Sequence, residues 1–147
     1  MEGNNFLLEE QLCFSTYTLS KQFTKLYRPA LEPYSLTYTQ YVALLVLWEK
    51  SDLSVQSLGT RLGLDSGTLT PMLKRMEANG YITRNRHPED ERRVIIATTS
   101  KADELKEELL EKVSACLALL NLDEKDYFDL LAKINQLTTT LGGINNG

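Results

Sequence analysis

Two cysteines are the residues best suited to covalent chemistry in this chain of 147 residues. Cys13 lies near the N-terminus and Cys116 lies toward the C-terminus. A thiolate attacks a peroxide oxygen and becomes a sulfenic acid, so a cysteine with this role needs access and a lowered pKa. The alternative is that both are small apolar packing residues, because free cysteine is often buried.

Tyrosines follow Cys13 at helical spacing. Tyr17 comes four residues later, one turn along the same face of a helix. Tyr27 comes fourteen residues later, about 40° away on the helical wheel at roughly 100° per residue. These tyrosines, together with Tyr38, are either partners of the thiol or ordinary core aromatics.

The middle of the chain has the pattern of a helix-turn-helix. The pattern predicts a support helix at residues 55–64, with a tight turn near Gly63. It predicts the second helix at residues 65–79. Thr70 followed by Pro71 is the stronger local start signal for that helix. The apolar phase instead favours a start near Asp65, which would place Pro71 one turn inside. The residues that set this phase are Leu69, Met72, Leu73 and Met76.

Polar and basic residues of this motif are candidates for contact with DNA. We expect Ser66, Thr68 and Thr70 to reach bases or phosphates, and Lys74 and Arg75 to reach phosphates. Two β-rich segments, 81–86 and 93–98, are joined by the polar loop 87–92 and predict a β-wing. The wing adds the cations Arg84, Arg86 and Arg92, of which Arg92 is placed to enter a minor groove. The alternative is a solvated basic face.

The hydrophobic periodicity predicts a mainly α-helical fold with a small β-hairpin. We expect one domain over residues 1–147, a winged helix-turn-helix at 52–99 flanked by dimerisation helices within 6–36 and 101–141. The predicted order is four helices, two strands and two helices. Outside the helix-turn-helix, the predicted helices are Phe6–Tyr27, Tyr38–Trp48, Lys101–Leu120 and Asp123–Leu141. Arg28-Pro29 ends or bends the first of them, and a loose tail at 142–147 follows the last.

The charge distribution is compatible with DNA binding despite a net charge of −4. Residues 61–93 carry seven cations against five acids, whereas the rest of the chain carries nine cations and fifteen acids. An acidic remainder repels DNA and helps to orient the basic face toward phosphates.

Composition narrows the class of protein further. No apolar run approaches the roughly 20 residues that span a bilayer, and the N-terminus lacks a secretory pattern. We therefore expect a cytoplasmic protein without membrane contact, in which the cysteines are thiols. With one histidine, His87, no C-x-x-C pair and no glycine-rich nucleotide loop, the sequence predicts no metal, no cofactor and no enzyme. A thiol peroxidase that uses Cys13 remains an alternative.

The run Asp65–Glu77 resembles the recognition helix of the MarR family, in particular its organic-hydroperoxide-sensing (OhrR-type) branch. Asp90-Glu91-Arg92 is similar to that family's wing pattern, and Gln11–Phe14 is similar to the branch's sensing helix. The resemblance covers about Glu9 to Leu141 and extends to staphylococcal oxidation-sensing regulators of the AbfR type.

The resemblance implies a dimeric repressor that binds pseudo-palindromic double-stranded operator DNA and leaves it when Cys13 is oxidised by peroxide. In the family that the chain resembles, tyrosines at the positions of Tyr27 and Tyr38 hydrogen-bond the sensing sulfur from the other subunit, and Tyr17 is a third candidate for this support. Cys116 lies where some relatives carry a resolving cysteine that captures the sulfenic acid across the dimer, while others use a low-molecular-weight thiol. A MarR-type repressor released by a small phenolic ligand and a structural interaction module remain alternatives.

Overall fold

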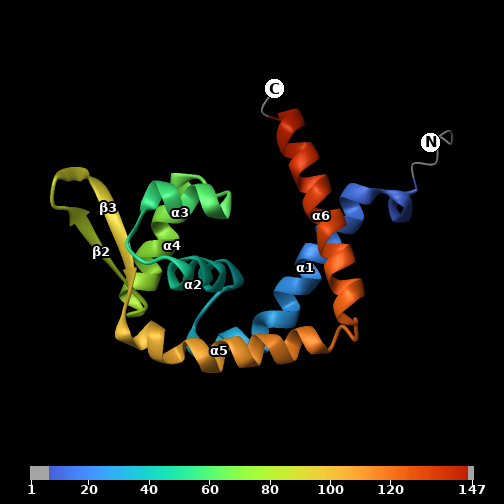
Figure 1. Ribbon diagram of the computed structural model, residues 1–147, viewed down its shortest axis with the longest axis horizontal. Helices are drawn as coiled ribbons and strands as arrows, with labels where there is room; N and C mark the ends of the chain where they lie inside the picture. Colours follow the sequence, from blue (N-terminus) through green and yellow to red (C-terminus); the bar gives the residue numbers. More distant parts are fainter. Residues whose placement is uncertain (1–6, 146–147) are drawn as a thin grey trace. The chain divides into compact units, whose positions relative to one another are not determined.

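The computed structural model describes residues 7–145, which form two compact units with their boundary between Val113 and Ser114. The elements of the first unit are η1 (Leu8–Glu10), α1 (Leu12–Leu31), η2 (Glu32–Tyr34), α2 (Tyr38–Glu49), β1 (Leu53–Ser54), α3 (Val55–Leu62), α4 (Ser66–Ala78), β2 (Ile82–His87), β3 (Asp90–Thr98) and most of α5 (Ser100–Ala118) (Figure 1). The second unit holds the end of α5 and α6 (Glu124–Asn145).

Helix α1 starts and ends later than predicted. The predicted start, Phe6, lies outside the described residues, and a short 3-10 turn and an extended Gln11 precede α1. Of the two outcomes predicted at Arg28-Pro29, an end of the helix was wrong, because α1 continues through Pro29 to Leu31. A proline this close to the end removes one helical hydrogen bond, while Leu31, only 2% exposed, adds core packing that favours the helix.

The prediction of helix α2 was confirmed at its start. Thr37 caps it through a reciprocal pair of hydrogen bonds with Gln40, which satisfies two backbone donors at the helix end. The sequence missed β1, which has only two residues and is too short to show strand alternation. Leu53 of β1 pairs with Ile96 of β3.

The helix-turn-helix consists of α3 and α4. Gly63 takes a left-handed φ of 65° between them, which glycine allows without steric cost. Asp65 caps α4, so the predicted start near Asp65 was confirmed and Pro71 lies inside the helix. Gly80, at φ 79°, follows the end of α4, where a glycine with a left-handed φ commonly ends a helix.

The wing is a hairpin of β2 and β3 within an antiparallel sheet of order β1-β3-β2, and β2 contacts α4 (Figure 1). The predicted loop 87–92 was too long. His87 pairs with Asp90, so only Pro88 and Glu89 join the strands, and Arg92 lies in β3. The Asp90 carboxylate accepts a hydrogen bond from the Arg92 N–H, which supports this tight turn.

The core of the first unit lies between the helix-turn-helix, α2, α5 and the inner face of the sheet. Its fully buried side chains include Leu44, Leu47, Leu58, Leu69, Leu73, Met76, Ile82, Ile96 and Leu109. Tyr81, also buried, donates its hydroxyl to the Tyr34 carbonyl and thereby joins the start of the wing to the segment before α2. This unit positions both α4 and the wing.

Helix α6 runs to Asn145, so the predicted end at Leu141 was wrong. Gly142 and Gly143 do not take the positive φ that ends many helices, and they continue the helix instead. The last two residues of the predicted loose tail lie outside the described residues. None of the residues of α6, all of them described, is buried. None of the helices within residues 7–145 is long and apolar enough to cross a membrane.

Candidate nucleic-acid interface and redox site

Helix α4 turns one face to the core and leaves the opposite face open. Leu69, Met72, Leu73 and Met76 are buried and fix the helix in place. Four of the predicted contact residues, Ser66, Thr68, Lys74 and Arg75, are exposed, and Thr70 is half-buried. The open face therefore combines short hydroxyl groups near the N-terminus with two cations one to two turns later.

Thr68 has a structural role that the sequence did not reveal. Its backbone N–H and its hydroxyl both donate to the Asp65 carboxylate, at 2.9 and 3.1 Å. These hydrogen bonds hold the pKa of Asp65 below its usual range. Because the Thr68 hydroxyl already donates its proton, its remaining capacity toward a base is as an acceptor.

The three wing arginines that were predicted to contact DNA have different surroundings. Arg84 is half-buried and its Nε lies 3.0 Å from a carboxylate oxygen of Glu77, so it ties β2 to α4. Arg86 donates one guanidinium N–H to the Glu91 carbonyl. Arg92 is exposed, and among the described residues its guanidinium takes part in no ion pair. Of these three arginines, Arg92 is thus the one best able to reach a ligand.

The Cys13 thiol lies on an exposed stretch of α1. Its neighbours Leu12 and Tyr17 are 64% and 60% exposed, which is unusual for large apolar side chains. The Lys21 ammonium lies 5.1 Å from the centre of the Tyr17 ring. The structure therefore places Tyr17 beside a cation on the surface and not in a core.

Tyr27 and Tyr38 belong to an aromatic cluster at the other end of α1. Their rings stack with centroids 5.3 Å apart, and Phe23 and Tyr41 complete the cluster. Burial raises the pKa of the Tyr41 phenol, and the nearby Tyr38 raises it further. The sequence did not single out Phe23 or Tyr41 for this cluster, although Phe23 follows the same helical spacing as Tyr27.

Within one chain the cluster is far from Cys13. Fourteen residues of helix separate Cys13 from Tyr27, and a rise of 1.5 Å per residue gives about 21 Å. This separation is well beyond hydrogen-bond reach. A phenol at this position can meet the sulfur only if it comes from another chain.

Cys116 lies in the last turn of α5, within the second unit. Its side chain is half-buried and the sulfur is not in a disulfide. Its backbone carbonyl accepts a hydrogen bond from Leu119, where the helix ends. Among the described residues, no cluster of His, Cys, Asp and Glu has the arrangement of a metal site.

Comparison with known proteins identifies the fold and the family. Residues 25–109 match the family described as transcriptional regulator SarA/Rot. The organic hydroperoxide resistance transcriptional regulator of Bacillus subtilis is 47% identical over 134 residues, 91% of each protein. The chain is a MarR-family transcriptional regulator of the SarA/Rot type.

This MarR-family chain is also similar to solved structures of AbfR, one of which is described as AbfR of Staphylococcus epidermidis. Reduced AbfR bound to DNA is 36% identical with a TM-score of 0.86, over 98% of this chain and 99% of that chain. AbfR has also been solved overoxidised on DNA (36% identity, TM-score 0.77, 91% and 94% covered) and with a disulfide formed (37%, 0.67, 95% and 93%). The predicted winged-helix fold is confirmed.

Proposed function

We propose that this regulator is a cytoplasmic repressor that binds operator DNA as a reduced homodimer and leaves it when a peroxide oxidises Cys13. The observation that carries the proposal is the exposed Cys13 thiol, about 21 Å along its own helix from the stacked pair Tyr27 and Tyr38. The same family includes a hydroperoxide resistance regulator and a protein solved on DNA in reduced and overoxidised states.

The exposed apolar side chains support the homodimer. On α1 they include Leu12, Phe14 and Leu19, and on α6 they include Phe128, Leu131 and Ile134. Monomeric proteins rarely expose such runs of large apolar residues. A two-fold dimer buries them and brings Tyr27 and Tyr38 of one subunit to Cys13 of the other, where a phenol donor favours the thiolate over the thiol.

The exposed face of α4 supports recognition of double-stranded DNA. In a two-fold dimer, two such helices enter successive major grooves about 34–36 Å apart. Ser66, Thr68 and Thr70 then meet base edges, while Lys74 and Arg75 bind phosphates. Arg92 enters the minor groove from the wing, and Arg86 contributes a further cation near the backbone. Arg84, paired with Glu77, serves mainly to hold the wing against α4.

The proposed switch begins with the Cys13 thiolate. It attacks one oxygen of a hydroperoxide, the O–O bond breaks, and the alcohol leaves, with Cys13 now a sulfenic acid. The Cys116 thiolate of the other subunit then attacks this sulfur, a disulfide forms and the sulfenic oxygen leaves as water. A disulfide confines two Cα atoms to about 4.4–6.8 Å, so its formation moves the helices that carry them and alters the spacing of the recognition helices.

Non-reducing electrophoresis tests the disulfide step. After treatment with an organic hydroperoxide, we expect a dimer band in wild type that is lost in both Cys13→Ser and Cys116→Ser and reverses with dithiothreitol. A dimer band that persists in Cys116→Ser would show that Cys116 is a packing residue. A mobility-shift assay of the reduced protein on its own promoter tests the DNA-binding part separately.

A further inference from the structure

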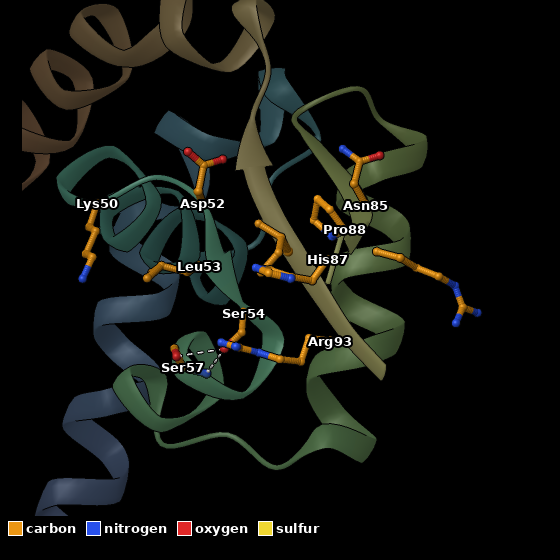
Figure 2. A pocket seen from close by; sticks show the side chains of 11 residues that line it. Lys50, Asp52, Leu53, Ser54, Ser57, Asn85, His87, Pro88 and Arg93 are labelled. Carbon is orange, nitrogen blue, oxygen red and sulfur yellow. Dashed lines mark hydrogen bonds between the residues drawn. The ribbon is translucent and has the colours of Figure 1, made fainter. Parts of the chain in front are cut away.

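An open pocket of about 550 Å³ lies beside the wing (Figure 2). No residue of α4 lines it, so it is distinct from the exposed face of that helix. It is lined from four places in the first unit: the loop after α2, β1, the first turn of α3 and the two strands of the wing. The polar and charged residues that line it include Lys50, Asp52, Ser54, Ser57, Arg86 and Arg93.

Strand pairing explains why Ser54 and Arg93 line the same pocket. Ile95 of β3 pairs with Ser54 on one side and with Asn85 on the other, so these three residues share a face of the sheet. Arg93 precedes Ile95 by two residues and therefore lies on that face as well. In Figure 2 the Arg93 side chain extends from β3 toward Ser54 and Ser57.

The charge of the pocket is opposite to that of the chain. The protein has more acidic than basic residues, yet the pocket has three cations, Lys50, Arg86 and Arg93, and one carboxylate, Asp52. Among the described residues, none of these three cations takes part in an ion pair. Arg86 donates a guanidinium N–H to the Glu91 carbonyl and follows Asn85 on β2, so its side chain lies on the opposite face of the sheet. The charges of Lys50 and Arg93 are therefore the ones available to an anion.

The two serines add a hydroxyl donor. Ser54 accepts a hydrogen bond from the Ser57 N–H at 3.0 Å and donates its own proton to the Ser57 hydroxyl oxygen at 2.8 Å (Figure 2). The Ser57 hydroxyl thus keeps its own proton for a ligand. A hydroxyl together with a guanidinium and an ammonium is a set of donors that suits a phosphate group.

We propose that this pocket binds a phosphate group, and that on DNA this group is a backbone phosphate next to the wing. The second half of the proposal rests on the proposed DNA-binding function. The first helix of a helix-turn-helix crosses the DNA backbone, and here that helix is α3, whose first turn forms part of the pocket. The hairpin that supplies Arg93 also carries Arg92, so a wing in the minor groove would have phosphates on either side.

Salt-dependent DNA binding tests the site. Because Arg93 is exposed, Arg93→Ala leaves the fold intact and Arg93→Lys keeps the charge. We expect Arg93→Ala to lower operator affinity about tenfold and to reduce the slope of log affinity against log salt by about 2 per dimer, equally on operator and scrambled DNA. Arg93→Lys restores most of the slope. Asp52→Asn removes the opposing carboxylate and strengthens binding, and asparagine tolerates the positive φ of 59° at this position.

A control variant separates the pocket from net charge. Lys133→Ala on α6 removes an exposed cation from the second unit and leaves both affinity and slope unchanged. If Lys133→Ala and Arg93→Ala lower affinity equally, the effect is one of net charge and the proposed pocket is refuted. If the wild-type protein binds no DNA at any salt concentration, the proposed DNA-binding function is refuted. Phosphate binding by the pocket is then tested by titration with inorganic phosphate alone.

Titration with inorganic phosphate in the absence of DNA measures the pocket by itself. We expect the backbone amide signals of Ser54 and Ser57 to shift in nitrogen–proton spectra at millimolar phosphate, with a much smaller shift in Arg93→Ala. Unchanged signals together with unchanged DNA affinity in Arg93→Ala would overturn the proposal. Shifted signals with unchanged DNA affinity would overturn the assignment to backbone phosphate and point to a free phosphorylated ligand.

Discussion

Tyr27 and Tyr38 stack face to face, with ring centroids 5.3 Å apart and ring planes only 7° from parallel. Tyr27 is buried, whereas Tyr38 is 38% exposed, so Tyr38 is the member of the pair that lies at the surface of the first unit. Such a stack holds the rings in a fixed orientation, which suits them to receive a thiolate from another chain.

Removal of these hydroxyl groups should slow oxidation of Cys13. In Tyr27→Phe and Tyr38→Phe the rings still stack, but a donor to the thiolate is lost. A hydrogen bond to a charged group contributes about 1.5 kcal/mol or more, so its loss reduces the reactive thiolate about tenfold. We expect a fall of that order in the rate of dimedone trapping after peroxide, followed by mass spectrometry.

Tyr41→Phe is the matched control, because Tyr41 belongs to the same cluster but is not one of the two tyrosines that the proposal brings to the sulfur. Its oxidation rate should equal that of wild type. Equal rates in all three variants would remove the tyrosines from the redox site and leave them as core aromatics.

Two wing arginines, Arg92 and Arg84, should differ in their effect on DNA binding. Arg92→Ala should weaken operator binding and reduce the slope of its salt dependence by about 2 per dimer, since it removes one phosphate-proximal cation per subunit. Arg84→Ala should change the slope much less, because Glu77 already neutralises Arg84. Fluorescence anisotropy at several salt concentrations measures both slopes. Equal losses in the two variants would contradict the assignment.

Asp65 should make α4 sensitive to acid. Its folded-state pKa is lowered below the reference value of 3.8, so it stabilises the fold above that pH and this contribution is lost as pH falls through the folded-state value. Asp65→Ala should therefore unfold at lower temperature than wild type at pH 7, with the difference shrinking below about pH 4. Asp65→Asn keeps an acceptor for the Thr68 N–H without the charge, and its deficit should be smaller. A difference in melting temperature that persists unchanged to pH 2 would contradict this role.

The exposed apolar residues of α6 should stabilise the homodimer. Each Leu or Ile side chain buried in an interface contributes about 1.5–3 kcal/mol. Leu131→Lys combined with Ile134→Lys should therefore shift the protein toward monomer in sedimentation experiments at micromolar concentration. Gln136→Lys adds a similar charge at an exposed polar position of the same helix and should remain dimeric. An intact dimer in the double variant would place the interface elsewhere.

Much of the fold was predictable because local patterns agreed with tertiary packing. The buried phase of Leu69, Met72, Leu73 and Met76 identified the start of α4 correctly against the competing Thr70-Pro71 signal. The same reasoning failed at Pro29 and at Gly142, where a helix continues through residues that usually end one. At Pro29 the added burial of Leu31 favours continuation, and periodicity in the sequence does not measure such packing.

The candidate site was predictable in its residue types but not in its pairings. The sequence indicated the cations of the wing, but not that Arg84 is held by Glu77 while Arg92 is available. Nor did it indicate that the Thr68 hydroxyl donates to the Asp65 cap, or the pocket that contains Arg93. These features depend on which side chains meet across strands and turns, and residue spacing alone does not determine that.

Titration of hydroperoxide against the reduced protein–DNA complex shows whether oxidation of Cys13 controls DNA binding. With operator DNA labelled and anisotropy as the signal, wild type should leave the DNA completely at about one equivalent of hydroperoxide per subunit and rebind after dithiothreitol. Cys13→Ser should stay bound throughout. Release of Cys13→Ser at the same peroxide concentration, or a wild-type complex that survives stoichiometric oxidation of Cys13, would contradict the proposal that Cys13 controls DNA binding.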